Sequence, residues 1–143
     1  SHMSYNVTIL DRQGNYKTVF IAPDREPRVT RLAMTTNHQQ GVEWDQHARA
    51  SATLEREHAL ERYMKRYADD SFRLVRAFLR PPLHSTAYRR GFGTIYTAVY
   101  RPESLDMEYL WPNDSWHFPL TGFVDGTRTV KFANVPGSLE ILH

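Results

Sequence analysis

The stretch GFGTIYTAVYRPESLDMEYLWP, Gly91–Pro112, has the clearest two-residue periodicity in the chain. Its first arm alternates one face with the other in the order Thr94, Ile95, Tyr96, Thr97, Ala98, Val99, Tyr100. Its second arm does the same in the order Met107, Glu108, Tyr109, Leu110, Trp111. β-Branched and aromatic residues of this kind favour a pleated, packed surface. The stretch therefore predicts a β-hairpin, and its first arm, apolar on both faces, predicts a central strand covered on two sides.

The rest of the chain supplies further strands and two helices around this hairpin. Alternating patterns predict strands over residues 5–10, 16–22, 28–37, 115–123 and 127–133. A helical pattern covers residues 47–67, and a second apolar set follows over residues 72–79. This order predicts an α+β fold in which an antiparallel β-sheet packs against an antiparallel helix pair.

Local signals mark the boundaries of these elements. The segment Asp11–Asn15 has turn chemistry and joins the first two strands into a hairpin. Asp69-Asp70-Ser71 is an N-terminal capping signal for the second helix, and Arg80-Pro81-Pro82 ends that helix. Adjacent carboxylates at a helix start point apart, so we interpret Asp69 and Asp70 as capping residues and not as an acid–base pair.

Length and composition are those of one globular domain. The chain has 143 residues, of which 41% are hydrophobic and 13% aromatic. We expect residues 4–143 to form a single α+β domain, because Ser1-His2-Met3 has the sequence left by cleavage of an affinity tag. The 18 basic and 16 acidic residues are interspersed, which argues against nucleic-acid binding. The sequence shows no membrane span or secretory signal, so we expect no membrane partner and a cytoplasmic location.

Several kinds of site are disfavoured by the residue types present. The chain has no cysteine, which excludes disulfides, thiolate metal sites and a cysteine nucleophile within these residues. His38, Glu43, His47 and His58 lack the spacing of a helical zinc motif, so we predict no metal and no cofactor. No Gly-x-Ser-x-Gly nucleophile elbow supports a self-contained serine hydrolase.

Several stretches resemble the C-terminal part of the N-terminal-nucleophile hydrolases, in the group of penicillin acyltransferase (acyl-coenzyme A:6-aminopenicillanic acid acyltransferase) and choloylglycine hydrolase. The similar stretches are, in order, SYNVTILD, TVFIAPDREPRVTR, TTNHQ, VEW, FLRPPLHS, GFGTIYTAVYRPES and MEYLWP. They extend from about Tyr5 to about Phe123. The resemblance implies that the chain is part of an αββα sandwich, in which helices cover two stacked sheets.

The resemblance also implies a mechanism. In the family, a cysteine freed at an N-terminus attacks an amide or acyl carbonyl and forms a thioester. Hydrogen-bond donors, among them an asparagine side chain, then stabilise the oxyanion. Asn37, in Thr36-Asn37-His38 at the expected end of the third strand, matches the position of such an asparagine. The alternative is an asparagine that caps its own turn.

Two further sets of residues are open to two interpretations. The family has an arginine near its nucleophile, and Arg76, Arg80, Arg89 and Arg90 are candidates, although most such arginines are solvated or ion-paired. Aromatic residues of the hairpin region could line an acyl pocket, but packing on the sheet face is the simpler interpretation. The aromatic residues concerned are Tyr96, Tyr100, Tyr109, Trp111 and Trp116.

Two functions follow from these observations. In the first, the chain is the C-terminal portion of a linear amide hydrolase or acyltransferase, inactive alone, whose partner is the missing N-terminal portion carrying the nucleophile. In the second, it is a non-catalytic binding or structural module that forms a homodimer through an exposed sheet face.

Overall fold

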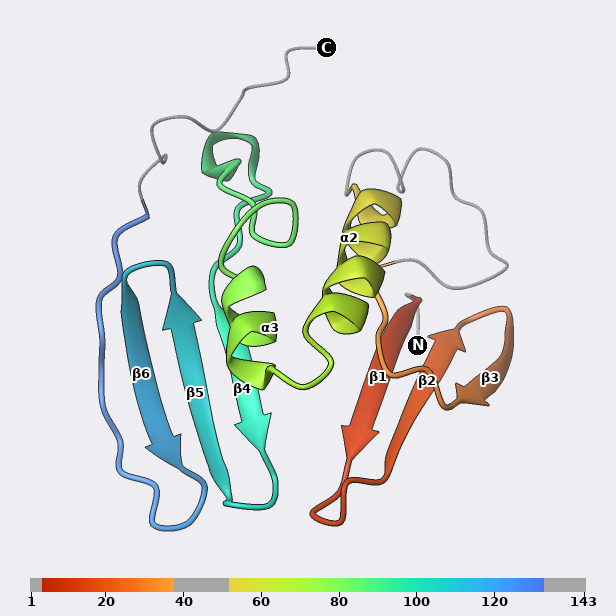
Figure 1. The fold of residues 1–143 in the computed structure, drawn as a ribbon, viewed down its shortest axis with the longest axis horizontal. Helices are drawn as coiled ribbons and strands as arrows, with labels where there is room; N and C mark the ends of the chain where they lie inside the picture. Colours follow the sequence, from red (N-terminus) through yellow and green to blue (C-terminus); the bar gives the residue numbers. More distant parts are fainter. Residues whose placement is uncertain (1–3, 38–51, 133–143) are drawn as a thin grey trace.

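A computed structural model describes residues 4–37 and 52–132. Within these residues, two three-stranded antiparallel sheets and two α-helices confirm the α+β class (Figure 1). The elements are, in chain order, β1 (Tyr5–Leu10), β2 (Tyr16–Ala22), β3 (Arg25–Thr30), α2 (Thr53–Arg66), α3 (Ser71–Ala77), the 3₁₀ turn η1 (Tyr88–Arg90), β4 (Thr97–Arg101), β5 (Asp106–Trp111) and β6 (Asp114–Pro119).

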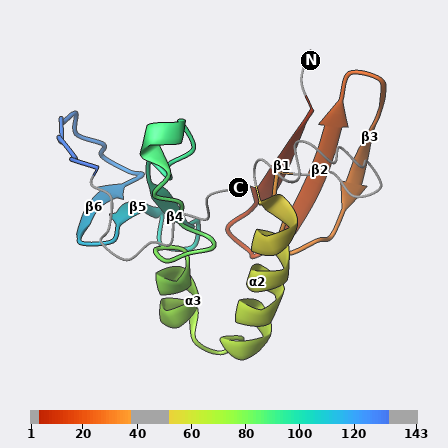
Figure 2. The ribbon, with the colours of Figure 1, turned by 90° about the horizontal axis from the view of Figure 1, so that it is seen from above.

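The helices form the antiparallel pair that their short connection predicts, and both lie on the same side of the sheets (Figure 2). Helix α2 lies nearer to the sheet β1-β2-β3, and α3 lies in front of the sheet β4-β5-β6 (Figures 1 and 2). The strands therefore divide into two sheets, each next to one helix. In the described part of the chain, neither helix is long and apolar enough to cross a membrane.

The first sheet has the order β1-β2-β3. Thr18, Phe20 and Ala22 are buried and alternate along the middle strand β2, so they share one face. The expected third strand over residues 28–37 is wrong in its bounds, because β3 covers Arg25–Thr30. The strand includes Pro27, which an edge strand tolerates because one of its sides makes no ladder hydrogen bonds. Residues 31–37 follow it without regular structure.

The sequence signals agree with the end of α2 and with both ends of α3. Helix α2 ends at Arg66, as its periodicity predicts, while the expected start at residues 47–51 lies outside the described residues. Helix α3 begins after Asp70, whose side chain accepts a hydrogen bond from the backbone N–H of Arg73 at 2.9 Å. This confirms the capping role of Asp70. The helix ends at Ala77, before the proline pair.

The second sheet has the order β4-β5-β6, and β5 is its middle strand. The expectation that the first hairpin arm is a central strand is therefore wrong for the described residues, because β4 lies at the edge. The reason is that Asp114–Pro119 returns through a tight turn and pairs with the free side of β5. The apolar pattern of β4 indicates that the strand favours burial, but it does not indicate which strands pair with it. Tyr100 of β4 remains 59% exposed.

Alternation gives the second sheet two different faces. The face towards α3 carries Val99 and Leu110, and Thr97 on this face donates to the carbonyl oxygen of Phe78, just beyond α3, at 3.4 Å. The opposite face carries most of the aromatic residues, and we call it the aromatic face. Its residues are Ala98, Tyr100, Met107, Tyr109, Trp111, Trp116 and Phe118, with Tyr96 just before β4.

The chain after β6 runs beside that strand without forming the further strand expected over residues 127–133 (Figure 1). Residues 127–132 have no ladder partner, and Ala133 lies outside the described residues. Side chains hold the segment in place. Arg128 forms an ion pair with Asp114, with Nε 3.2 Å from Oδ2, and the ring of Phe123 stacks at 6.1 Å from that of Phe118.

In the loop before β4, a close contact with Tyr88 explains why the GFGT motif has glycine at position 93. The ring of Tyr88 lies against the backbone of Gly93, where a Cβ atom would come within 1.8 Å of Tyr88 Cδ1. The Tyr88 hydroxyl donates to the carbonyl oxygen of Thr94 at 3.0 Å, and Thr94 exchanges two hydrogen bonds with Ser85. Only glycine allows this close approach, which brings the loop after α3 onto the start of the hairpin.

We predict that Gly93→Ala lowers the free energy of unfolding by about 1–3 kcal/mol, because the new methyl group overlaps the Tyr88 ring. Urea denaturation of the variant and the parent chain measures this loss. In the Tyr88→Ala background, the same substitution is expected to cost far less, because the overlapping ring is gone. An equal loss in both backgrounds would show that the ring contact is not the cause.

His84 is a buried titratable group in the same loop. Its side chain is 4% exposed, and its Nδ1 atom has no hydrogen-bond partner among the described residues. Burial lowers the pKa of His84 below its ordinary value of 6.5, because the charged imidazolium would lose its hydration. The unfolded chain then binds a proton at a higher pH than the folded chain does.

Stability is therefore expected to fall as the pH drops below about 6.5, by at most ~1.4 kcal/mol per pH unit for this one group. His84→Gln should flatten the stability curve between pH 7.5 and pH 5.5, measured by urea denaturation at a series of pH values. His58→Gln, which changes an exposed histidine on α2, serves as the matched control and should keep the slope. A slope that persists in His84→Gln would exclude this histidine as its source.

Candidate functional site

Asn37 lies beyond the end of β3, in the irregular segment that leads towards α2. The sequence predicted that this asparagine would stand directly at a strand end, and that position is wrong because β3 stops at Thr30. Its side chain is exposed. A side chain in such a segment needs contacts from other elements to hold a defined orientation.

Arg56 of α2 provides such a contact. Its Nη2 atom donates to Oδ1 of Asn37 at 2.7 Å. A guanidinium has five N–H donors and no acceptor, so it faces the amide oxygen and not the amide nitrogen. The Nδ2 group of Asn37 is thereby directed away from Arg56. The contact thus leaves the two N–H bonds of the amide available to an acceptor on another side.

The residue before Asn37 is held from two elements. Thr53, fully buried in the first turn of α2, donates its hydroxyl to the hydroxyl oxygen of Thr36 at 2.8 Å. Asn6 of β1 donates its side-chain amide to the carbonyl oxygen of Thr36 at 2.7 Å and to the hydroxyl of Thr35 at 2.9 Å. We call these residues with Asn37 and Arg56 the Asn37 site. A strand and a helix together fix the backbone from which Asn37 projects.

The electrostatics of the Asn37 site depend on Arg56. Its side chain is partly buried, and this burial lowers the pKa of its guanidinium from the ordinary value. An arginine stays charged even so, since its ordinary pKa lies far above neutral pH. The charge polarises the Asn37 amide through the bonded oxygen, which makes the Nδ2 hydrogens better donors. Chemically, the site can present an oriented amide N–H to an oxygen that bears negative charge.

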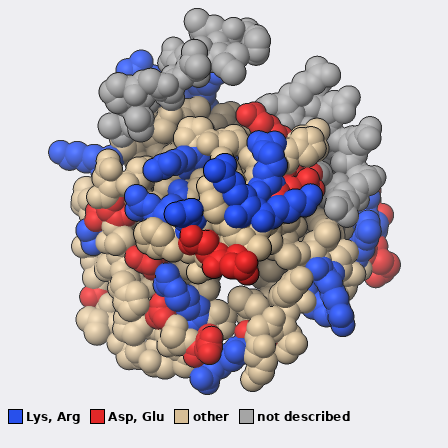
Figure 3. All heavy atoms as spheres, viewed as in Figure 1, with Lys and Arg blue, Asp and Glu red and all other residues tan. Residues whose placement is uncertain are grey.

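The arginine candidates from the sequence do not gather at Asn37. Arg76, Arg80, Arg89 and Arg90 are exposed, and within the described residues none of the four has an ion-pair partner. Figure 3 shows Lys and Arg side chains gathered over the region of the two helices. These four arginines are therefore open to solvent, and the arginine that contacts Asn37 is Arg56.

No cluster of three or more His, Cys, Asp or Glu side chains suited to a metal ion occurs among residues 4–37 and 52–132. His58 is exposed on α2. The other members of the candidate set, His38, Glu43 and His47, lie outside the described residues.

The aromatic residues of the hairpin pack on one another. The rings of Tyr96 and Tyr109 lie 4.7 Å apart, those of Tyr109 and Phe118 5.3 Å apart, and those of Trp116 and Phe118 4.4 Å apart. These are the tilted and edge-on contacts that aromatic side chains prefer. They support packing on the sheet face, and Tyr100 and Trp111 also line the groove described next.

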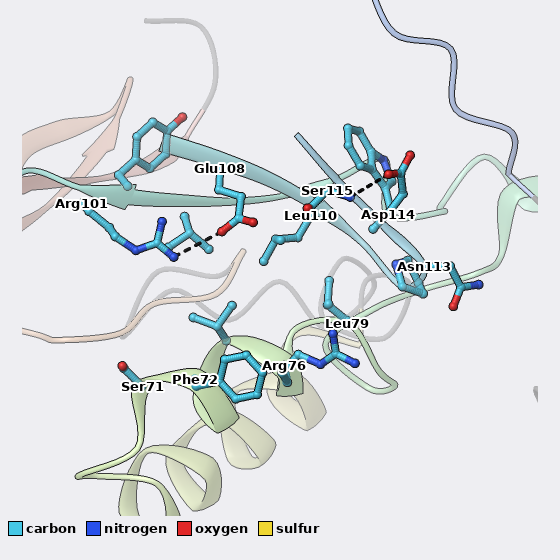
Figure 4. Close-up of a pocket in the computed structure, with 15 residues that line it drawn as sticks. Ser71, Phe72, Arg76, Leu79, Arg101, Glu108, Leu110, Asn113, Asp114 and Ser115 are labelled. Carbon is cyan, nitrogen blue, oxygen red and sulfur yellow. Dashed lines mark hydrogen bonds and ion pairs between the residues drawn. The ribbon is translucent and has the colours of Figure 1, made fainter. Parts of the chain in front are cut away.

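A groove of about 990 Å³ lies between α3 and the second sheet (Figure 4). Phe72, Val75 and Leu79 of the α3 segment form one wall, and Val99 and Leu110 of the sheet form the other. Arg101 and Glu108 form an ion pair at 3.3 Å near one end (Figure 4). Sequence reasoning did not identify this groove, because α3 and the sheet contribute to it from distant parts of the chain.

Sequence reasoning also missed Arg56, Thr53 and Asn6. Arg56 lies within the helical pattern, where its charge fits a solvated helix face, and Asn6 alternates within a strand. No local motif distinguishes them. Their role appears only when α2 and β1 are brought to the segment before Asn37.

The model of the acyl-coenzyme A:6-aminopenicillanic acid acyl-transferase family matches residues 1–116. The chain therefore belongs to this family, which relates it to acyltransferases of the N-terminal-nucleophile type. No curated protein and no solved structure gave a significant match.

Proposed function

We propose that this chain is the C-terminal portion of an N-terminal-nucleophile acyltransferase or linear amide hydrolase, and that Asn37 donates to the oxyanion of the reaction. The observation that carries the proposal is the hydrogen bond from Arg56 to Oδ1 of Asn37, because it turns the donor end of the amide outwards. Family membership supports the reaction class.

The proposed roles follow from the chemistry of acyl transfer. A nucleophile attacks the carbonyl carbon, and the carbonyl oxygen becomes negatively charged in the tetrahedral intermediate. A donor fixed before the reaction stabilises that charge without the cost of reorganising water. Asn37 supplies the donor, Arg56 orients it, and Thr53 and Asn6 hold the preceding backbone.

The nucleophile comes from other residues of the complete protein in this proposal, because the 143 residues contain no cysteine. The chain alone is then inactive, and its first partner is the portion that carries the nucleophile. The family description suggests the substrates for a first assay, an acyl-coenzyme A donor and 6-aminopenicillanic acid.

We expect Asn37→Ala in the complete protein to lower kcat about 10²–10³-fold with little change in KM, because the donor acts on the charge that develops in the transition state. Release of the coenzyme A thiol and formation of the amide product measure the rate. Arg56→Met should also lower kcat, but less, since the amide remains present without its orientation. Gln13→Ala, which removes an exposed amide in the first hairpin turn, is the matched control and should leave the rate unchanged.

Two results would contradict the proposal. An active complete protein with an unchanged kcat in Asn37→Ala would exclude the oxyanion role. Absence of both acyl transfer and amide hydrolysis in the complete protein would exclude the enzyme proposal itself.

The exposed aromatic face supports a second candidate function, a binding or structural module that forms a homodimer. Tyr96 and Tyr100 are 50% and 59% exposed, and Phe123, which stacks on Phe118 of the same face, is 60% exposed. Neighbouring exposed rings of this kind are typical of protein interaction surfaces.

If this face mediates a homodimer, the chain should sediment as a dimer, and Tyr100→Lys should shift the equilibrium to the monomer because a charge replaces a buried ring. Analytical ultracentrifugation over a range of concentrations measures the shift. Tyr16→Lys, which changes an exposed tyrosine of the first sheet, is the control and should leave the dimer intact. A chain that stays monomeric at all concentrations would exclude this function.

A further inference from the structure

The groove between α3 and the second sheet has an apolar lining and an arginine that forms no ion pair with the described residues. Its volume of about 990 Å³ is at the upper end of the range found for small-molecule sites. Three apolar side chains from the α3 segment and two from the sheet line the groove, and Figure 4 shows Phe72 and Leu79 across from Leu110. Phe72 is 73% exposed at the wall, so its ring is available to cover an occupant.

Each acidic side chain that lines the groove forms an ion pair with a neighbouring arginine. Glu108 forms an ion pair with Arg101 at 3.3 Å. Asp114, at the other end, forms an ion pair with Arg128, with 3.2 Å between Nε and Oδ2. Arg101 also forms an ion pair with Asp106 at 3.0 Å, so it is shared between two carboxylates and offers no free positive charge to a ligand.

Arg76 has no such partner among the described residues. It lies on α3 between Phe72 and Leu79, and Figure 4 shows its side chain extending towards the end of the groove at Asn113. Asn113 and Ser115 line the same end and offer uncharged hydrogen-bonding side chains. The groove thus has one uncompensated guanidinium next to polar groups, and a long apolar part beside it.

We propose that this groove binds a carboxylate attached to a hydrophobic chain of medium length. The carboxylate accepts hydrogen bonds from the guanidinium of Arg76, whose planar fork matches the two carboxylate oxygens. The chain lies along Val75, Val99 and Leu110 and contacts the ring of Phe72. A ligand with several phosphates fits less well, because the lining offers a single free cation. Binding does not depend on catalysis, so this proposal is independent of the oxyanion role of Asn37.

Calorimetric titration of the chain with octanoate tests the proposal. We expect saturable binding of one octanoate per chain, and no binding of octylamine, which has the same chain and the opposite charge. Arg76→Gln should weaken octanoate binding about tenfold or more, because a charge-assisted hydrogen bond is lost. Arg80→Gln, which changes an exposed arginine outside the groove, is the matched control and should bind as the parent chain does.

Phe72→Ala provides a second test at a position so exposed that its loss should not disturb the fold. It should weaken octanoate binding while leaving the circular dichroism spectrum unchanged. Equal binding of octanoate and octylamine, or unchanged affinity in Arg76→Gln, would overturn the proposal. Absence of saturable octanoate binding would also overturn the proposal. This holds equally if ultracentrifugation shows a dimer in which a second copy closes the groove.

Discussion

The second sheet depends on the backbone pairing of β5 with a strand on each side. Asp106–Trp111 pairs with β4 through residues 97–101 and with β6 through residues 114–119. Because side chains alternate along a strand, this single middle strand sends Leu110 towards α3 and Tyr109 towards the aromatic face. A slip of one residue would exchange the two sets and place the aromatic rings under the helix. The groove and the aromatic face both follow from this register.

Helix α3 forms one wall of the groove through its position on that sheet. It is short, its start is set by the Asp70 cap, and it ends at Ala77, before the proline pair. The hydrogen bond from Thr97 to Phe78 ties its C-terminal end to β4. The close contact between Tyr88 and Gly93 then returns the chain to the start of the hairpin. Local signals thus limit the helix, while contacts distant in sequence place it and leave a groove along one side.

The Asn37 site is built by polar contacts instead of apolar packing. Hydrogen bonds from β1 and α2 converge on two consecutive residues, Thr36 and Asn37. This arrangement explains how an irregular segment can present a side chain in one orientation. Arg56 orients the Asn37 amide, because an arginine can only donate hydrogen bonds, and its charge polarises that amide. The sequence motif made Asn37 a candidate but did not point to Arg56, since a charged residue within a helix usually faces solvent.

A local sequence pattern predicts turns and caps, but it does not predict which strands pair. The turn at Asp11–Asn15 and the Asp70 cap follow from short-range hydrogen bonds, and both are present. The pattern over residues 127–132 is as strand-like as that of β6, but no neighbouring strand pairs with it. A strand requires a partner, and the sequence of the strand itself does not name that partner.

The sequence by itself determined the α+β class, the central hairpin, the helix boundaries near Asp70 and Pro81, and the family relationship, because each depends on periodicity, capping or motif order within short stretches. Only the tertiary structure decided the strand order, the pairing of Arg56 with Asn37, and the uncompensated charge of Arg76 in the groove. These depend on which distant segments meet, and that is a property of the packed chain as a whole.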